Sequence, residues 1–209
     1  MKTTTELIAK EGWKALVVVL VGLLLSWLLG WDFLVFVFLV AALCAMYFYR
    51  NLERIPEDVA DDSVLAPLDG IIRDIQNKED GIHLNIKKPI CFCGMLRMPL
   101  AKSGKAGEAV ELEHVFGVKN GDRVIGEKVK IAFKRDAGSK TVLYLTLYPR
   151  NLSQLVLYFW DLDFKLGERL GFFLSGDAEF VIPLNAELKV NIGDKIYAGQ
   201  TLLANSKEL

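Results

Sequence analysis

The first quarter of the chain is dominated by two apolar runs, Ala15–Gly30 and Phe33–Tyr49, which meet at Trp31-Asp32. At about 1.5 Å per residue, each run spans roughly 24 Å as a helix, slightly less than the ~30 Å hydrocarbon core of a bilayer. Leu, Val, Phe, Ala and Trp occupy every side of both runs, so neither helix has a face that prefers water. The pattern predicts a tight helical transmembrane hairpin over residues 15–49.

The charges that flank the two runs predict how the hairpin is oriented. Lys10 and Lys14 precede the first run and Arg50 and Arg54 follow the second, whereas the turn carries only Asp32. By the positive-inside rule, both ends then lie in the cytoplasm, so we expect an inner-membrane protein whose later residues face the cytoplasm. A cleaved signal peptide is shorter than this region. A buried hairpin inside a soluble core is the other alternative, and the ~150 residues that follow would hardly cover it.

Beyond residue 63 the pattern changes to short runs rich in Val, Ile, Leu, Phe or Tyr, bounded by Gly, Asn, Asp or Pro. Such runs are typical of strands joined by turns, and no helical stretch of comparable length interrupts them. The pattern predicts a mostly antiparallel β barrel or sandwich. We therefore expect an N-terminal cytoplasmic segment 1–14, the hairpin 15–49, a linker 50–63 and a β domain 64–209. The expected strands are Ile71–Ile75, Ile82–Ile86, Ala109–Phe116, Lys128–Phe133, Thr141–Tyr148, Gln154–Trp160, Glu179–Leu184 and Ile196–Ala204.

A short phrase with Gly-Asp or Gly-Glu at a turn recurs at Val118–Val124, Leu162–Leu170 and Val190–Gly199. Glycine lets the backbone reverse direction, and the apolar residues that follow begin the next strand. The last copy resembles the hairpins of lipoyl- and biotinyl-type β domains, but it lacks the exposed Lys that those domains modify. The phrase therefore predicts a structural repeat and no prosthetic-group carrier.

Charge and composition exclude several classes of function. The net charge is −1 and the pI is near 6.2, so there is no basic footprint for nucleic acid. Cys91 and Cys93 form a Cys-x-Cys pair and Cys44 lies in the second apolar run, a spacing that makes neither a zinc site nor a disulfide framework. His83 and His114 both lie in strand-like stretches. We expect neither a metal nor a nucleic-acid partner.

The order of several motifs resembles a known family. Tyr47–Pro56 reads Tyr-Phe-Tyr-Arg-Asn-Leu-Glu-Arg-Ile-Pro and Ala66–Gly70 reads Ala-Pro-Leu-Asp-Gly. Together with the preceding hairpin, they resemble the small, membrane-anchored phosphatidylserine decarboxylases. Leu152–Phe173, which ends Gly-Glu-Arg-Leu-Gly-Phe-Phe, is similar to that family's stretch before its self-cleavage site, and Glu179–Ala204 is similar to its carboxy-terminal subunit. The resemblance covers nearly the whole chain.

The resemblance implies a lyase of phospholipid metabolism that converts phosphatidylserine to phosphatidylethanolamine and CO2. In this family the proenzyme cuts itself at a Gly-Ser bond, and the Ser becomes a pyruvoyl group. This group forms a Schiff base with the substrate amine and takes up electrons as CO2 leaves. An Asp-His pair activates the Ser, and Asp69 matches the Asp. Self-processing therefore requires both a side-chain hydroxyl and a proton acceptor.

Residues 174–177 match the family's self-cleavage region, so the residue that supplies the hydroxyl is expected among them. Counted without gaps from Gly-Glu-Arg-Leu-Gly, the family's Gly-Ser falls on Gly176-Asp177, and a carboxylate cannot undergo the acyl shift that forms pyruvoyl. With a two-residue gap, Ser175 becomes the precursor, preceded by Leu174 in place of the flexible Gly. A purely structural interpretation is a β turn between two strands. A pyruvoyl cofactor thus follows only if the chain cleaves itself.

The family's base falls on the segment that begins at Phe92. In the family this segment reads Asp-x-His-x-x-[Arg/His]-x-Pro. In this chain, Phe92 stands at the Asp position of that pattern and Gly94 at its first His position. Arg97 stands where some members have His, but an arginine cannot accept a proton near neutral pH. Of the catalytic pair, only Asp69 keeps a matching residue, and an Asp before Gly is also a common turn residue.

Three hypotheses follow. The first is an active decarboxylase with Ser175 as the pyruvoyl precursor and Asp69 assisting. The second is a degenerate relative that keeps the anchor and the β domain but has lost self-processing, and that binds lipid headgroups or regulates a partner. The third is an unrelated membrane-tethered β domain with a periplasmic role. The expected partners are membrane phospholipid and either a second copy of the chain or an active homologue.

Overall fold

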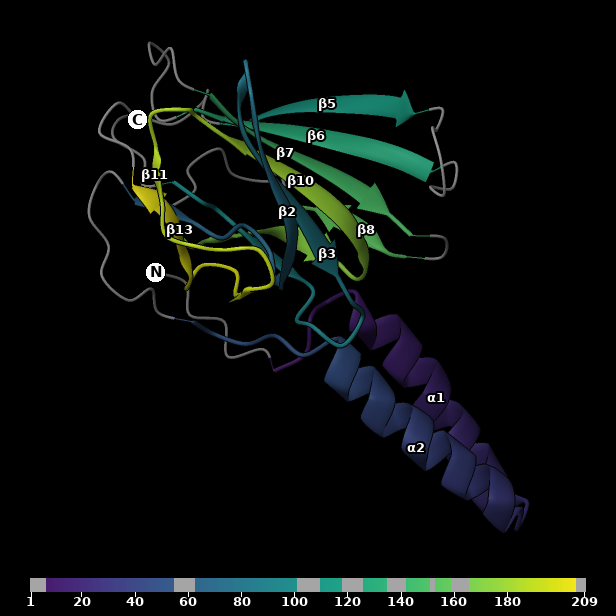
Figure 1. Cartoon of the computed structure of the whole chain (residues 1–209). Helices are drawn as coiled ribbons and strands as arrows, with labels where there is room; N and C mark the ends of the chain where they lie inside the picture. The colour runs from purple at the N-terminus through teal and green to yellow at the C-terminus, as the bar shows by residue number, and fades with distance from the viewer. Residues whose placement is uncertain are drawn as a thin grey trace. The chain divides into compact units, whose positions relative to one another are not determined.

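The computed structural model describes residues 7–54, 63–100, 110–117, 126–134, 142–150, 153–158 and 166–205. The chain divides into two compact units, Met1–Glu53 and Arg54–Leu209. Figure 1 shows the first unit as two helices and the second as twisted β-sheets. The expectation of a mostly antiparallel β fold preceded by a helical hairpin is therefore confirmed.

The first unit is a hairpin of α1 (Gly12–Leu28) and α2 (Asp32–Phe48). In the turn, Gly30 adopts φ +69°, a left-handed conformation that residues with a Cβ rarely take. The Trp31 N–H then donates to the Ser26 carbonyl at 3.0 Å, which closes the end of α1. The predicted break at Trp31-Asp32 is where the second helix begins.

Backbone hydrogen bonds also join the open end of the hairpin. The Ala9 N–H donates to the Tyr49 carbonyl at 2.7 Å, and the Asn51 N–H donates to the Leu7 carbonyl at 2.9 Å. These bonds pair the segment before α1 with the segment after α2. The first unit is therefore tied at both ends.

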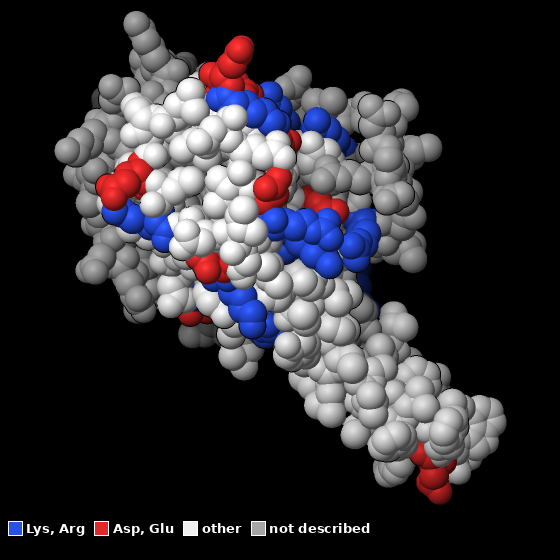
Figure 2. Space-filling view, viewed as in Figure 1, with Lys and Arg blue, Asp and Glu red and all other residues white. Residues whose placement is uncertain are grey.

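The surface of the hairpin is apolar along both helices. Figure 2 shows its visible face as almost uncharged, whereas Lys, Arg, Asp and Glu are spread over the β domain. Each helix has 17 residues, or about 25 Å, and within the described ranges no helix is long and apolar enough to cross a membrane. The expected transmembrane character of the hairpin is therefore not supported. The large hydrophobic side chains of the hairpin that are at least half exposed are Trp13, Val17, Val18, Val21, Leu24, Leu25, Trp27, Leu28, Leu29, Trp31, Phe33, Phe36, Leu43 and Tyr47.

The second unit consists of antiparallel strands in three sheets. The main sheet has the order β12-β2-β3-β10-β7-β6-β5, and two small sheets have the orders β1-β13-β11 and β4-β9-β8. Figure 1 shows the main sheet twisting from β2 across to β5. The strands are β1 (Ser63–Leu65), β2 (Gly70–Lys78), β3 (Gly81–Lys88), β4 (Met95–Arg97), β5 (Val110–Gly117), β6 (Gly126–Lys134), β7 (Val142–Pro149), β8 (Leu155–Leu157), β9 (Arg169–Phe173), β10 (Gly176–Ile182), β11 (Glu187–Leu188), β12 (Lys195–Ile196) and β13 (Leu202–Asn205).

The core lies on one face of the main sheet, where alternate residues of its central strands are buried. Phe180 of β10 is paired with Leu84 of β3 on one side and with Leu145 of β7 on the other, and all three are fully buried. Each such side chain contributes about 1.5–3 kcal/mol relative to an exposed position. The period-two pattern that predicted these strands thus reflects one buried and one exposed face.

Two predicted strands differ in the structure. Ile196–Ala204 is divided into β12 and β13, because the Gln200 and Thr201 N–H groups turn back to the Tyr197 carbonyl at 3.1 and 3.0 Å. The strand predicted at Gln154–Trp160 is limited to β8, and its last two residues lie outside the described ranges. Ala109, Thr141 and the repeat at Val118–Val124 also lie outside them.

Candidate functional site

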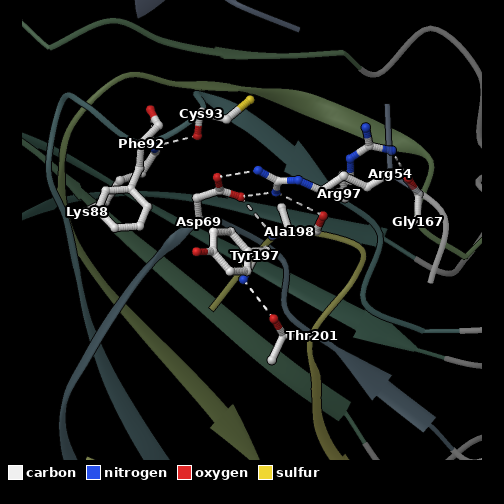
Figure 3. Close-up of polar contacts among 10 residues, drawn as sticks. All are labelled: Arg54, Asp69, Lys88, Phe92, Cys93, Arg97, Gly167, Tyr197, Ala198 and Thr201. Atoms are coloured by element: carbon white, nitrogen blue, oxygen red, sulfur yellow. Dashed lines mark hydrogen bonds and ion pairs between the residues drawn. The ribbon is translucent and has the colours of Figure 1, made fainter. Parts of the chain in front are cut away.

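A buried ion pair joins the segment that enters the β domain to the loop before β2. Asp69, in this loop, is 1% exposed, and its two carboxylate oxygens each accept a hydrogen bond from the Arg54 guanidinium, the Oδ2 contact at 2.7 Å. The Ala198 N–H donates a further bond to Asp69 Oδ1 at 2.8 Å. Figure 3 shows the Asp69 carboxylate enclosed between these two groups. Charge-assisted bonds of this kind fix a carboxylate in one orientation.

The turn after β12 is built around the Arg54 side chain. Burial lowers the pKa of Arg54, but its hydrogen bonds and charge attraction to Asp69 outweigh burial and hold the pKa above its ordinary value. The guanidinium lies 5.2 Å from the centre of the Tyr197 ring. The Tyr197 N–H donates to Thr201 Oγ1 at 2.9 Å, which closes the turn (Figure 3). Arg54 is thus a permanent cation in a structural site.

Phe92 and Gly94 stand at the positions where the family resemblance places the catalytic base, and in the structure both residues make backbone contacts. The Phe92 carbonyl lies 3.4 Å from Nζ of the fully buried Lys88. The Gly94 carbonyl accepts the Phe173 N–H at 2.7 Å. A Cβ at Gly94 would lie 2.3 Å from the Phe172 ring. A histidine at this position therefore does not fit unless Phe172 moves.

Arg97, the third position of that segment, ties β4 to the loop before β9. Its side chain is buried, and Nη1 donates to the Gly167 carbonyl at 2.8 Å (Figure 3). Its N–H donates to the Pro67 carbonyl at 2.8 Å. These contacts connect β4 to two loops.

The predicted self-cleavage region lies at the junction of β9 and β10. Ser175 is half-buried, its N–H donates to Ser153 Oγ at 2.9 Å, and its carbonyl accepts the Arg150 N–H at 3.3 Å. Gly176 is the first residue of β10, and a Cβ there would lie 2.3 Å from the Tyr148 carbonyl oxygen. Only glycine fits at position 176, because the neighbouring strand approaches so closely.

Asp177 lies on the face of β10 that points away from the core. It is half-buried between the buried residues Gly176 and Ala178, and it lines a surface depression together with Arg73, Asn85 and Tyr148. The volume of the depression is about 10 Å³, room for about one water molecule. Within the described ranges, no hydrogen bond or ion pair joins Asp69 to Ser175 or Asp177. The described residues therefore show no direct bond between the predicted site residues.

His83 belongs to a separate cluster. Its Nδ1 lies 2.8 Å from Glu179 Oε1, and its Nε2 lies 2.8 Å from Asp80 Oδ1. Burial raises the pKa of Glu179, but the hydrogen bond and charge of His83 outweigh burial and hold the pKa below its ordinary value. The hydrogen bond from His83 also lowers the pKa of Asp80. His114 lies in β5, outside the side chains that the structure describes.

The described residues hold a carboxylate, cations and backbone donors, and among them no hydrogen bond joins the Ser175 hydroxyl to a proton acceptor. Within these residues no group of three or more His, Cys, Asp or Glu has the arrangement of a metal site. Two cations of this region are not predicted from the sequence: the partly buried Arg54, as the partner of Asp69, and the fully buried Lys88. Lys88 had a signal in the sequence, because it continues the inward series of Leu84 and Ile86 at period two.

Comparison with known proteins gives one consistent result. Over nearly its whole length, the chain is similar to proteins named phosphatidylserine decarboxylase proenzyme. It is 28% identical to that of Polynucleobacter asymbioticus, covering 95% of this chain and 94% of the relative. It is 26% identical to that of Ehrlichia ruminantium (94% and 90%) and 24% identical to that of Geotalea uraniireducens (97% and 98%). No protein-family model and no solved structure matches the chain.

The fold and these matches define a small antiparallel β protein whose relatives are, by name, proenzymes. Over nearly its whole length, the chain is similar to the phosphatidylserine decarboxylase family. The resemblance predicted from the order of the motifs is therefore confirmed.

Proposed function

We propose that this protein is a phosphatidylserine decarboxylase-related member of phospholipid metabolism that does not make a pyruvoyl group. It acts as a β domain held at the membrane, where it binds phospholipid or regulates a partner. The observation that supports this proposal is the buried Arg54–Asp69 pair. The Arg54 guanidinium and the Ala198 N–H take three of the roughly four acceptor positions of this carboxylate, and neither partner is a histidine.

The residues at the self-cleavage positions do not fit a pyruvoyl group. Asp177 carries a carboxylate, which cannot attack the preceding carbonyl and then eliminate to a keto acid. Ser175 has a hydroxyl, but the residues that form hydrogen bonds with its backbone are Ser153 and Arg150, and neither is a base that could take the hydroxyl proton. Gly94 leaves no space for the family's histidine. We therefore assign no reaction step to this group.

The apolar hairpin supports attachment to a membrane. Large hydrophobic side chains on both helices are exposed, and exposed apolar surface of this extent marks a membrane or protein contact. Lys10 and Lys14 precede the hairpin and Arg50 and Arg54 follow it, which favours an inner-membrane position with both ends in the cytoplasm. We propose that the hairpin inserts into the bilayer and that the β domain faces the cytoplasm.

A turnover assay tests the loss of chemistry. The full chain, purified in mild detergent, is incubated with phosphatidylserine, and phosphatidylethanolamine is measured by mass spectrometry. We expect no product from the native chain, and none from S175A or D177N. A decarboxylase from a relative, purified in the same way, provides the positive control.

The competing function is an active decarboxylase that uses Ser175 and Asp69. The names of the relatives favour it, because each is a decarboxylase proenzyme. Formation of phosphatidylethanolamine that is abolished by S175A or by D69N would establish that function and overturn the proposal. Formation that D177N alone abolishes would instead assign the reaction to Asp177.

A further inference from the structure

An uncharged turn follows β3 and exposes apolar side chains. The apolar turn, Pro89–Phe92, has Ile90 43% exposed, Cys91 exposed, and Pro89 and Phe92 half-buried. The Phe92 N–H donates to the Pro89 carbonyl at 3.2 Å, so the turn has a defined shape. Single exposed apolar residues are common, but turns are normally polar, and four consecutive residues without a charge are not typical of a solvated turn.

The apolar turn is held from inside the protein by Lys88. This lysine is 1% exposed, and its Nζ donates to the Cys93 carbonyl at 2.7 Å and lies 3.4 Å from the Phe92 carbonyl (Figure 3). Burying an ammonium group is costly unless it is well hydrogen-bonded. The fold therefore uses a buried cation to fix the conformation of a turn whose side chains face outward.

Basic side chains lie on the solvent face of the sheet beside the apolar turn. Lys195 of β12 is paired with Ile71 of β2, which is paired with Lys87 of β3, so the two lysines lie in one cross-strand row. Arg73 is exposed on β2, and Asp177 is the neighbour of Lys87 in β10. Figure 2 shows Lys and Arg side chains gathered over β3 and the neighbouring strands. The surface beside the turn is thus cationic, with one carboxylate.

The chain enters the β domain at the same end of the sheet. Arg54 is bound to Asp69, which directly precedes β2, and the first residues of β2 pair with the last residues of β3. The apolar turn begins one residue after β3 ends at Lys88. The entry point, the apolar turn and the lysine row are therefore neighbours within the β domain.

We propose that the apolar turn inserts into the interface of an anionic phospholipid bilayer, with Lys87, Arg73 and Lys195 against the lipid phosphates. This inference rests on the proposed membrane function and names the lipid surface that the β domain contacts. Apolar side chains and adjacent cations together are the combination that binds anionic membrane surfaces. Cys91 places a natural labelling site at the tip.

The test uses the full chain with C44S, so that a polarity-sensitive nitrobenzoxadiazole label reacts at the exposed Cys91 and not at the buried Cys93. The matched control carries the label at position 184 through C44S, C91S and L184C. Leu184 is 54% exposed and follows the opposite end of β10, where Ile182 pairs with Ile82. Intact mass confirms one label per chain.

Both proteins are bound to vesicles of phosphatidylcholine, with or without phosphatidylglycerol, recovered by flotation, and exposed to iodide. On vesicles with phosphatidylglycerol, we expect several-fold less iodide quenching at Cys91 than at position 184, together with quenching by doxyl-labelled lipid. We expect K87Q with R73Q to reduce this protection.

Equal iodide quenching at both positions on floated protein would overturn the role of the turn while leaving membrane attachment intact. If the chain does not float with the vesicles, neither the turn nor the hairpin binds the membrane, and both proposals are overturned. Protection that is the same without phosphatidylglycerol contradicts the role of the cations. Protection in detergent that grows with protein concentration would assign the turn to a second copy of the chain instead.

Discussion

At the residue scale, Asp69 has the identity that the family resemblance requires but different neighbours. Its carboxylate is bound by Arg54 and by the Ala198 N–H, and these two partners come from opposite ends of the β domain in sequence. A catalytic Asp needs a histidine to orient. In the structure, Asp69 instead joins the start of the domain to the turn near its carboxy terminus.

Removing this carboxylate should destabilise the β domain. D69N leaves the Arg54 guanidinium buried without its anion, and breaking such a pair typically costs about 3 kcal/mol or more. We expect a loss of about 3 kcal/mol in the free energy of unfolding, measured by urea denaturation followed by the circular dichroism of the sheet. The double variant R54Q/D69N should lose less than the sum of the single variants, because neither charge is then stranded. Additive losses would contradict the pairing.

The sequence could identify Asp69 but not its partners. Asp69 stands in a recognisable Asp-Gly motif, whereas Arg54 lies 15 residues away and Ala198 lies 129 residues away. The sequence analysis interpreted Arg54 as a flanking charge of the membrane hairpin. Local patterns carry no information on which side chain a buried carboxylate meets, because the sheet topology decides it.

At the scale of elements, the cluster at His83 fastens the β2–β3 hairpin to β10. The His83 ring has a carboxylate oxygen within hydrogen-bond distance of each nitrogen, Glu179 at Nδ1 and Asp80 at Nε2. Lys78 Nζ lies 3.7 Å from Glu179, and the Tyr148 hydroxyl lies 3.3 Å from the same carboxylate. Through Glu179, the cluster thus joins strands β2, β3 and β7 to β10.

This cluster predicts a loss of stability in acid. The pKa of Glu179 and that of Asp80 are both lower in the folded state than their ordinary values of 4.5 and 3.8. A lowered carboxylate pKa stabilises the fold above the unfolded pKa, and this contribution disappears as the pH falls through the folded pKa. We expect stability to decrease from about pH 5 downwards.

The variant H83Q tests the origin of that decrease. Glutamine has no charge to lower either pKa, so we expect a flatter dependence of unfolding free energy on pH below about 5. Thermal unfolding followed by circular dichroism across that range gives the comparison. An unchanged slope in H83Q would assign the acid sensitivity to other carboxylates.

Element prediction succeeded where strands are long and alternate. The strands at β2, β3, β6, β7 and β10 have one buried face, so their period is visible in the sequence. The short strands β1, β4 and β11 have two or three residues and pair with distant segments. They are too short to show the two-residue alternation of buried and exposed positions in the sequence. The predicted strand Ile196–Ala204 was wrong because its middle turns around Arg54 and Tyr197.

At the scale of the whole molecule, the two units differ in the character of their surfaces. The hairpin is apolar all round and the β domain carries the charge, which the sequence predicted from hydropathy alone. The length of the helices could not be read as accurately, because capping and the turn at Gly30 decide where each helix ends. The family was recognisable from motif order, although the catalytic pattern within it has changed.

The mass of the purified full chain tests the central claim, that this family member does not process itself, most directly. The protein, isolated from membranes without boiling or reducing agent, is measured intact and again after treatment with hydroxylamine, which reacts with a keto group. We expect one species of 23.4 kDa that hydroxylamine leaves unchanged. Two fragments, the smaller beginning at Ser175 or Asp177 with a hydroxylamine-reactive amino terminus, would contradict it.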